Sequence, residues 1–256
     1  MMTDKGLYIY CLAQGNQEEP LELRGLGGQP VEAFSHRGLI AVVEECEPKS
    51  LKSEDQKVLA DWLLIHQNVV DIAWERYETV LPFGFGMMIK SMDGKTASEN
   101  LKAWIERESE ELRGKLKRLK NKAEYGVQVI WDPAGILPKI KRSDKEIQDL
   151  EKEIQSKPKG VAYLLERKLA EIIKKRLEEA ANVYFKDFYQ RIRNCVGEIH
   201  VEKVRRENPP KQMIMNLSCL QEKDEGVLLG KELEKIGKIQ GFDVRFTGPW
   251  PPYSFV

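Results

Sequence analysis

The fold of this chain depends most on residues 157–195, which read KPKG and then VAYLLERKLAEIIKKRLEEAANVYFKDFYQRIRNC. The apolar residues recur at helical spacing, and Lys, Arg and Glu fill the other positions. This pattern predicts one long helix from Val161 to about Cys195 with a solvated charged face. The Pro-Gly break at Lys157–Gly160 separates it from a highly charged helix over Ser143–Gln155. Two helices joined by so short a turn are expected to form an antiparallel hairpin over residues 143–195.

Strand patterns flank this hairpin on both sides. The predicted strands are Tyr125–Trp131, Gly197–Val204, Gln212–Leu220 and Phe242–Phe246, with a helix over residues 224–239 before the last of them. The resulting order of strand, helices, strand, strand, helix and strand is that of the ferredoxin-like split βαβ fold. The sequence therefore predicts a C-terminal ferredoxin-like domain over residues 124–256, with the helical hairpin inserted in its first crossover.

The sequence predicts that residues 1–123 form an N-terminal α+β domain. Its strands and helices follow a different order from those of the C-terminal domain. Strand patterns cover residues 7–12, 31–35, 39–44 and 80–85, and helical patterns cover residues 53–73 and 98–120. Ser53 and Gln56 have the spacing of a capping box at the start of the first helix. The fold class expected for the whole chain is thus α+β with two domains, and the topology of the first domain stays open.

The chain ends in an aromatic and proline-rich tail, GPWPPYSFV, over residues 248–256. Three prolines within four positions make this segment stiff and extended, and exclude helix and central strand. Its rings, Trp250, Tyr253 and Phe255, require burial or a partner. Two interpretations follow. Packing of the tail against its own chain is favoured over a partner-binding tail, because apolar residues are usually buried.

A second aromatic stretch, LPFGFGMM, covers residues 81–88. Phe and Met make adaptable contact surfaces, whereas glycines in a core strand allow another backbone to approach closely, and the sequence does not separate these interpretations. The two stretches together give the candidate partner or interdomain contacts, which are Pro82, Phe83, Phe85, Trp250, Tyr253 and Phe255.

Composition excludes several classes of protein. The 41 basic and 41 acidic residues give a formal net charge of zero, which argues against a nucleic-acid partner. No apolar run approaches the roughly 18 residues of a membrane span, and the N-terminus has no secretory pattern. The four cysteines are scattered without metal-ligand spacing and are expected to be reduced thiols in the cytosol.

No catalytic, cofactor or metal site is expected from the sequence. His36, His66 and His200 lie far apart, and His66 reads as a core or interface histidine of an amphipathic helix. The glycine-rich stretch Gly25–Gly28 precedes a strand and not a helix N-terminus, so it is expected to be a turn without phosphate-binding function.

Several motifs resemble those of one known family. The ending GPWPPYSF after a short strand resembles the C-terminus of the gas vesicle protein F/L family (GvpF/GvpL). Other segments, which precede the tail, resemble motifs of this family and occur in the same order as they do there. They are Gly6–Tyr10, Arg37–Val43, His66 with Val69, Leu81–Gly86, Lys159–Leu164 and Met213–Asn216. The resemblance covers nearly the whole length, and the order of the segments together with the tail makes it specific.

The resemblance implies a cytoplasmic protein associated with gas vesicles, the hollow protein shells that give cells buoyancy. The implied function is assembly: non-enzymatic, chaperone-like binding of the hydrophobic shell subunit, with other minor gas vesicle proteins as further partners. A subunit with large apolar faces needs a partner that covers them before assembly. One alternative is a permanent minor structural component of the shell. A remote alternative is a small-molecule enzyme that uses an interdomain cleft.

Overall fold

The computed structural model describes residues 5–49 and 51–256. The fold is mixed α/β, with two sheets and, in this described part of the chain, six α-helices. The chain divides into two compact units, of which the first comprises Met1–Glu124 together with Pro249–Val256 and the second comprises Tyr125–Gly248. The domain boundaries predicted from the sequence place the tail in the C-terminal domain. In the structure, the last eight residues of the tail, Pro249–Val256, belong to the first unit.

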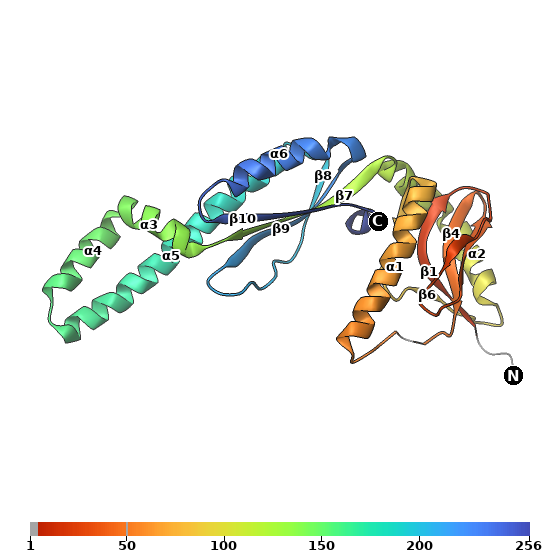
Figure 1. The fold of residues 1–256 in the computed structure, drawn as a ribbon, viewed down its shortest axis with the longest axis horizontal. Helices are drawn as coiled ribbons and strands as arrows, with labels where there is room; N and C mark the ends of the chain where they lie inside the picture. The colour runs from red at the N-terminus through yellow and green to blue at the C-terminus, as the bar shows by residue number, and fades with distance from the viewer. Residues whose placement is uncertain (1–4, 50) are drawn as a thin grey trace. The chain divides into compact units, whose positions relative to one another are not determined.

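The first unit is built on an antiparallel sheet with the order β2-β3-β4-β1-β5, in which β6 also pairs with β1. The strands are β1 (Gly6–Gln14), β2 (Leu21–Arg24), β3 (Pro30–His36), β4 (Leu39–Cys46), β5 (Val80–Pro82) and β6 (Met88–Ile89). Helices α1 (Gln56–Tyr77) and α2 (Ala97–Leu119) cover opposite faces of this sheet (Figure 1). The central strand β1 is buried along almost its whole length because both of its faces are covered.

A bulge in β1 decides which side chains reach the core beneath α1. Ile9 pairs with Val43 and Cys11 pairs with Val42, so Tyr10 is the extra residue. The alternation of side chains therefore shifts at Tyr10, so that Cys11 and Ala13 join Tyr8 and Tyr10 in the same core. That core contains Tyr8, Tyr10, Cys11, Ala13, Leu21, Val31, Ala33, Ile40, Val42, Val69, Val70, Ala73 and Val80.

The predicted capping box at the start of the first helix is wrong. Asp55 is the N-cap of α1, and its carboxylate accepts from the backbone N–H of Lys57 at 2.8 Å. Ser53 supports this cap from outside, because its hydroxyl accepts from the N–H of Asp55 at 3.1 Å. Asp caps as well as Ser does, and its negative charge adds a favourable interaction with the helix dipole, so the helix begins at Gln56.

The second unit contains a four-stranded sheet with the order β10-β7-β9-β8. Its strands are β7 (Lys122–Trp131), β8 (Glu198–Val201), β9 (Gln212–Glu222) and β10 (Phe242–Trp250). Its helices are α3 (Pro133–Ser143), α4 (Lys145–Ser156), α5 (Lys159–Arg193) and α6 (Gly226–Gly237). The long helix expected from the sequence is present as α5, and α3 lies between the predicted strand and the predicted charged helix, where no helix was expected.

Only the C-terminal end of α5 packs on this sheet, where Phe188 and Ile192 are buried and Phe188 meets the ring of Phe242 at 5.0 Å. The rest of α5 extends past the sheet and pairs with α3 and α4 (Figure 1).

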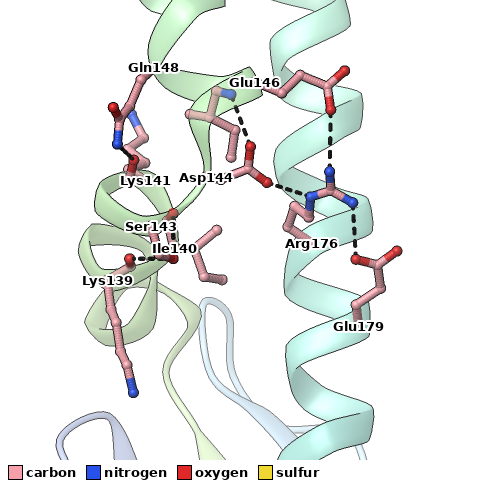
Figure 2. Close-up of polar contacts among 10 residues, drawn as sticks. Lys139, Ile140, Lys141, Ser143, Asp144, Glu146, Gln148, Arg176 and Glu179 are labelled. Carbon is pink, nitrogen blue, oxygen red and sulfur yellow. Dashed lines mark hydrogen bonds and ion pairs between the residues drawn. The ribbon is translucent and has the colours of Figure 1, made fainter.

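An ion-pair cluster holds the hairpin of α3, α4 and α5 together (Figure 2). Asp144 caps α4 and accepts from the Nε–H of Arg176 at 2.6 Å, and Arg176 also reaches Glu146 and Glu179. The Arg176 guanidinium lowers the pKa of the Asp144 carboxyl.

Candidate functional site

The candidate site lies in the first unit and is built around His66 of α1. His66 Nε2 lies 3.1 Å from the carbonyl oxygen of Phe83, which can only accept, so this nitrogen must carry the proton. His66 Nδ1 therefore accepts from the hydroxyl of Tyr8 at 2.8 Å, and that hydroxyl accepts from the N–H of Gly86 at 3.0 Å. Burial lowers the pKa of His66 and raises the pKa of Tyr8 to about 12, so both groups are neutral.

This network fixes the loop that follows β5. Besides the contacts from His66 and Tyr8, the N–H of Phe83 donates to the carbonyl of Tyr10 at 2.9 Å, and the carbonyl of Met87 accepts from the N–H of Ile9 at 3.1 Å. Backbone hydrogen bonds to β1 thus hold the loop at Phe83 and at Met87, and the side chains of His66 and Tyr8 hold it from the core. Its shape is set before any partner arrives, so ordering it would add little to the entropic cost of binding.

An apolar groove lies above this network, with a volume of about 570 Å³. It is lined by Ala60, Leu63, Leu64, His66 and Gln67 of α1, by Gly84 and Phe85 of the loop, and by Tyr253 of the tail. Leu63 and Leu64 are 51% and 67% exposed. The rings of Phe85 and Tyr253 lie 6.0 and 6.3 Å from the His66 ring, so the loop and the tail meet at this histidine. We call this surface the α1 groove.

The tail is anchored beside the groove by polar contacts and by burial. The backbone N–H and the hydroxyl of Ser254 donate to the carboxylate of Glu124 at 2.8 and 2.7 Å. The guanidinium of Arg118 donates to the carbonyl of Phe255, whose side chain is only 8% exposed. Burial raises the pKa of Tyr253, and among the described residues its buried hydroxyl has no hydrogen-bond partner.

The six contact residues proposed from the sequence fall into three groups. Phe85 and Tyr253 line the α1 groove. Pro82 is buried at the sheet edge opposite Cys11, Phe83 packs at 5.9 Å from the ring of Trp104, and Phe255 is buried. Trp250 is 43% exposed and does not line the groove.

Sequence reasoning missed Leu63 and Leu64, although a signal for them was available. The buried stripe expected in this helix consists of Val58, Leu59, Trp62, Ile65, Val69, Ile72 and Ala73. The two leucines lie off that stripe, and adjacent apolar residues on the outer side of an amphipathic helix indicate a contact surface.

The glycine-rich stretch Gly25–Gly28 forms a turn around the carboxylate of Glu44, a side chain of the same protein. The carboxylate of Glu44, which is fully buried, accepts from the N–H groups of Gly27 and Gln29 at 2.8 and 3.0 Å. It also accepts from the hydroxyl of Tyr10 at 2.7 Å. The stretch is therefore a turn whose backbone donors stabilise β4 through Glu44.

Within residues 5–49 and 51–256, no group of three or more His, Cys, Asp or Glu side chains is placed to hold a metal ion. None of the helices in the described part of the chain has the length and apolar character needed to cross a membrane.

The neutral state of His66 gives a pH-dependent prediction. Because its pKa is lower in the folded than in the unfolded state, the unfolded chain binds more protons near and below the ordinary His pKa of about 6.5. Stability is therefore full above this pH and falls as the pH drops towards the lowered pKa. Thermal unfolding between pH 7.5 and 5 should show this decline. His66→Gln, whose amide can donate to Phe83 and accept from Tyr8, should show a flatter curve, and an equally steep one would contradict the assignment.

Comparison with known proteins agrees with the motifs noted above. The profile of the family described as gas vesicle synthesis protein GvpL/GvpF matches residues 6–256. Gas vesicle protein L1 of Halobacterium salinarum is 29% identical over 266 residues, covering 99% of this chain and 91% of that relative. Gas vesicle protein F of Dolichospermum flosaquae is 23% identical over 254 residues, covering 97% and 96%. The crystal structure of GvpF from Anabaena sp. PCC7120 superposes with a TM-score of 0.77 at 19% identity, covering 98% of each chain.

The relatives that define this similarity are gas vesicle proteins by name, and the fold is that of solved GvpF structures. The chain belongs to the gas vesicle synthesis protein GvpL/GvpF family. The resemblance drawn from the sequence motifs is thus confirmed.

Proposed function

We propose that this protein is a non-enzymatic assembly factor that binds the hydrophobic shell subunit while gas vesicles form in the cytoplasm. The observation that carries the proposal is the α1 groove, where Leu63 and Leu64 stand exposed on a chain of which 32% is charged. Exposed apolar surfaces of this kind mark binding sites for apolar partners. Covering the apolar faces of the subunit before assembly is a chaperone-like task, and other minor gas vesicle proteins are further candidate partners.

The shape of the α1 groove and its aromatic side chains also suit the binding of a partner. A Cβ added at Gly84 would meet no atom within 4 Å, so a partner can approach the loop backbone closely. Phe85 and Tyr253 supply rings on rigid supports, and aromatic anchors contribute strongly to binding. Of the candidate contacts named from the sequence, we assign direct contact to these two and a supporting role to Pro82, Phe83 and Phe255.

We further propose that the second unit is a ferredoxin-like domain enlarged by the α3–α5 hairpin, with the boundary near residue 124. The strand order β10-β7-β9-β8 supports this class, because it places the first strand of the unit between the last and the third.

Substitution of a single groove leucine tests the proposed function. Leu64→Asp should weaken capture of the shell subunit about tenfold or more, because loss of one central apolar anchor is worth at least about 1.4 kcal/mol. The thermal stability should hardly change, since Leu64 is 67% exposed. The matched control is Leu228→Asp, at a leucine of α6 that is 59% exposed. Equal capture by both variants and the unchanged protein would contradict the proposal.

The position of the protein in vesicle formation needs a separate measurement. Purified vesicles washed with increasing denaturant should lose this protein early or lack it from the start, if it acts only during assembly. Retention until the shell itself dissolves would favour the alternative of a permanent minor shell component.

A further inference from the structure

The α1 groove has the shape of a site for a helix. On its α1 side the lining residues Ala60, Leu63, Leu64 and Gln67 follow the spacing i, i+3, i+4, i+7. They therefore form one continuous face of the helix, about 10 Å long at 1.5 Å per residue. Phe85 and Tyr253 form the other side. A channel between two apolar walls, about two helical turns long, matches the apolar stripe of an amphipathic helix.

The backbone around the groove is unsuited to the alternative, an added β-strand. Strand addition needs free N–H and C=O groups along an edge. In the loop beside the groove, the N–H and the carbonyl of Phe83, the N–H of Gly86, and the N–H and the carbonyl of Met87 are all engaged within the chain. A helix satisfies its own backbone and needs only side-chain contacts, which this surface supplies.

The two ends of the α1 groove differ in charge. Beyond Gln67 the same face of α1 continues to Asp71 and Glu75, and the amide of Gln67 donates to the carboxylate of Asp71 at 2.7 Å. The C-terminal end of α1 adds partial negative charge there. Arg76, the basic residue of the last turn, is paired with Glu19. This end of the groove is therefore acidic, while Lys57 lies towards the other end of the helix.

We propose that the α1 groove binds an amphipathic helix of the shell subunit, with its apolar stripe on Leu63, Leu64 and Phe85 and a Lys or Arg beside Asp71. This inference rests on the proposed function and adds the conformation, the polarity and the charge of the bound segment. Gly84 allows the close approach of the bound helix, since nothing fills the space above it.

The test uses overlapping synthetic peptides that cover the shell subunit, added to the full-length protein. The peptides captured should have apolar residues at i, i+3, i+4 and i+7 with Lys or Arg at one end of this stripe, and their helicity should rise on binding, as measured by circular dichroism. Gly84→Leu should reduce affinity at least tenfold by filling the groove. Its backbone is outside the left-handed region, so the variant should fold, and its thermal unfolding curve checks this.

Charge reversal tests the polarity. Asp71→Lys should weaken the basic peptide about tenfold and should restore binding of the same peptide with its Lys or Arg changed to Glu. Glu110→Lys, an equal change of charge at an exposed position of α2, should do neither. Binding that ignores Asp71→Lys, or bound peptides that stay non-helical, would overturn this inference while leaving the proposed function intact. If neither Leu64→Asp nor Gly84→Leu reduces capture of the intact shell subunit, the proposed function fails as well.

Discussion

Glu44→Ala should lower the free energy of unfolding of the first unit by about 3–5 kcal/mol, the largest effect expected of any single substitution considered. The Glu44 carboxylate is fully buried and accepts from the Tyr10 hydroxyl and from two backbone N–H groups of the glycine-rich turn. Alanine would leave the buried Tyr10 hydroxyl and the part-buried N–H groups of Gly27 and Gln29 without this acceptor. Each unsatisfied group costs about 1–3 kcal/mol. Denaturant unfolding followed by circular dichroism measures the change.

The neighbouring residue provides the control. Glu45 pairs with Lys5 on the surface, where the two side chains are 55% and 62% exposed. Glu45→Ala should therefore change stability by no more than about 0.5 kcal/mol. Glu44→Gln should lie between the two, because it keeps one acceptor oxygen but turns an NH₂ group towards donors. Similar losses for Glu44→Ala and Glu45→Ala would show that the buried carboxylate does not organise the turn.

The effect of Glu44→Ala should extend to binding. The ring of Tyr10 packs at 5.5 Å from His66, and Tyr8 packs at 4.7 Å from Tyr10. These rings lie under the α1 groove, so releasing the Tyr10 hydroxyl loosens the support of Phe85 and Tyr253. Capture of the shell subunit by Glu44→Ala should weaken even though no residue in the groove has changed.

The parts of the fold that could be predicted are those in which local pattern and final structure agree. The long helix α5 shows 3.6-residue periodicity over its whole length, and β1 is a short apolar run, so both were predictable. The helix α3 was not, because Pro133 and Pro138 both suggest a break. Pro133 stands at its first turn, where no N–H is needed, and the Asp132 carboxylate caps the helix by accepting from Ala134.

Short strands and buried networks escape prediction for a different reason. The strand β6 has two residues and exists only because β1 pairs with it. Glu44 lies 34 residues from Tyr10, and His66 lies 58 residues from Tyr8, so no local window contains either pair. Of the groove, the sequence identified Phe85 and Tyr253 as exceptional aromatic residues. Where they meet is decided by the hydrogen bonds that His66 and Tyr8 make to the loop after β5, and by the return of the tail to the first unit.

Removal of residues 249–256 should lower both the melting temperature of the first unit and its capture of the shell subunit. The deletion exposes the surface that buries Phe255 and leaves the buried carboxylate of Glu124 without the two donors of Ser254. We expect a loss of about 3–5 kcal/mol from one large ring and the charged hydrogen bonds. The α1 groove loses its Tyr253 wall at the same time. Calorimetry and a capture assay on the same preparations measure the two effects.

Point variants separate packing of the tail from direct recognition by it. Phe255→Ala should reproduce most of the loss of stability, because this ring is 8% exposed, whereas Trp250→Ala at a 43% exposed ring should cost much less. Tyr253→Ala should weaken capture more than Phe255→Ala does, because the Tyr253 ring lines the groove. It should also lower stability, because the same ring packs against the core of the first unit. A deletion that abolished capture without loss of stability would make the tail itself the binding element, and the rings of the tail would then act on the partner and not on the fold.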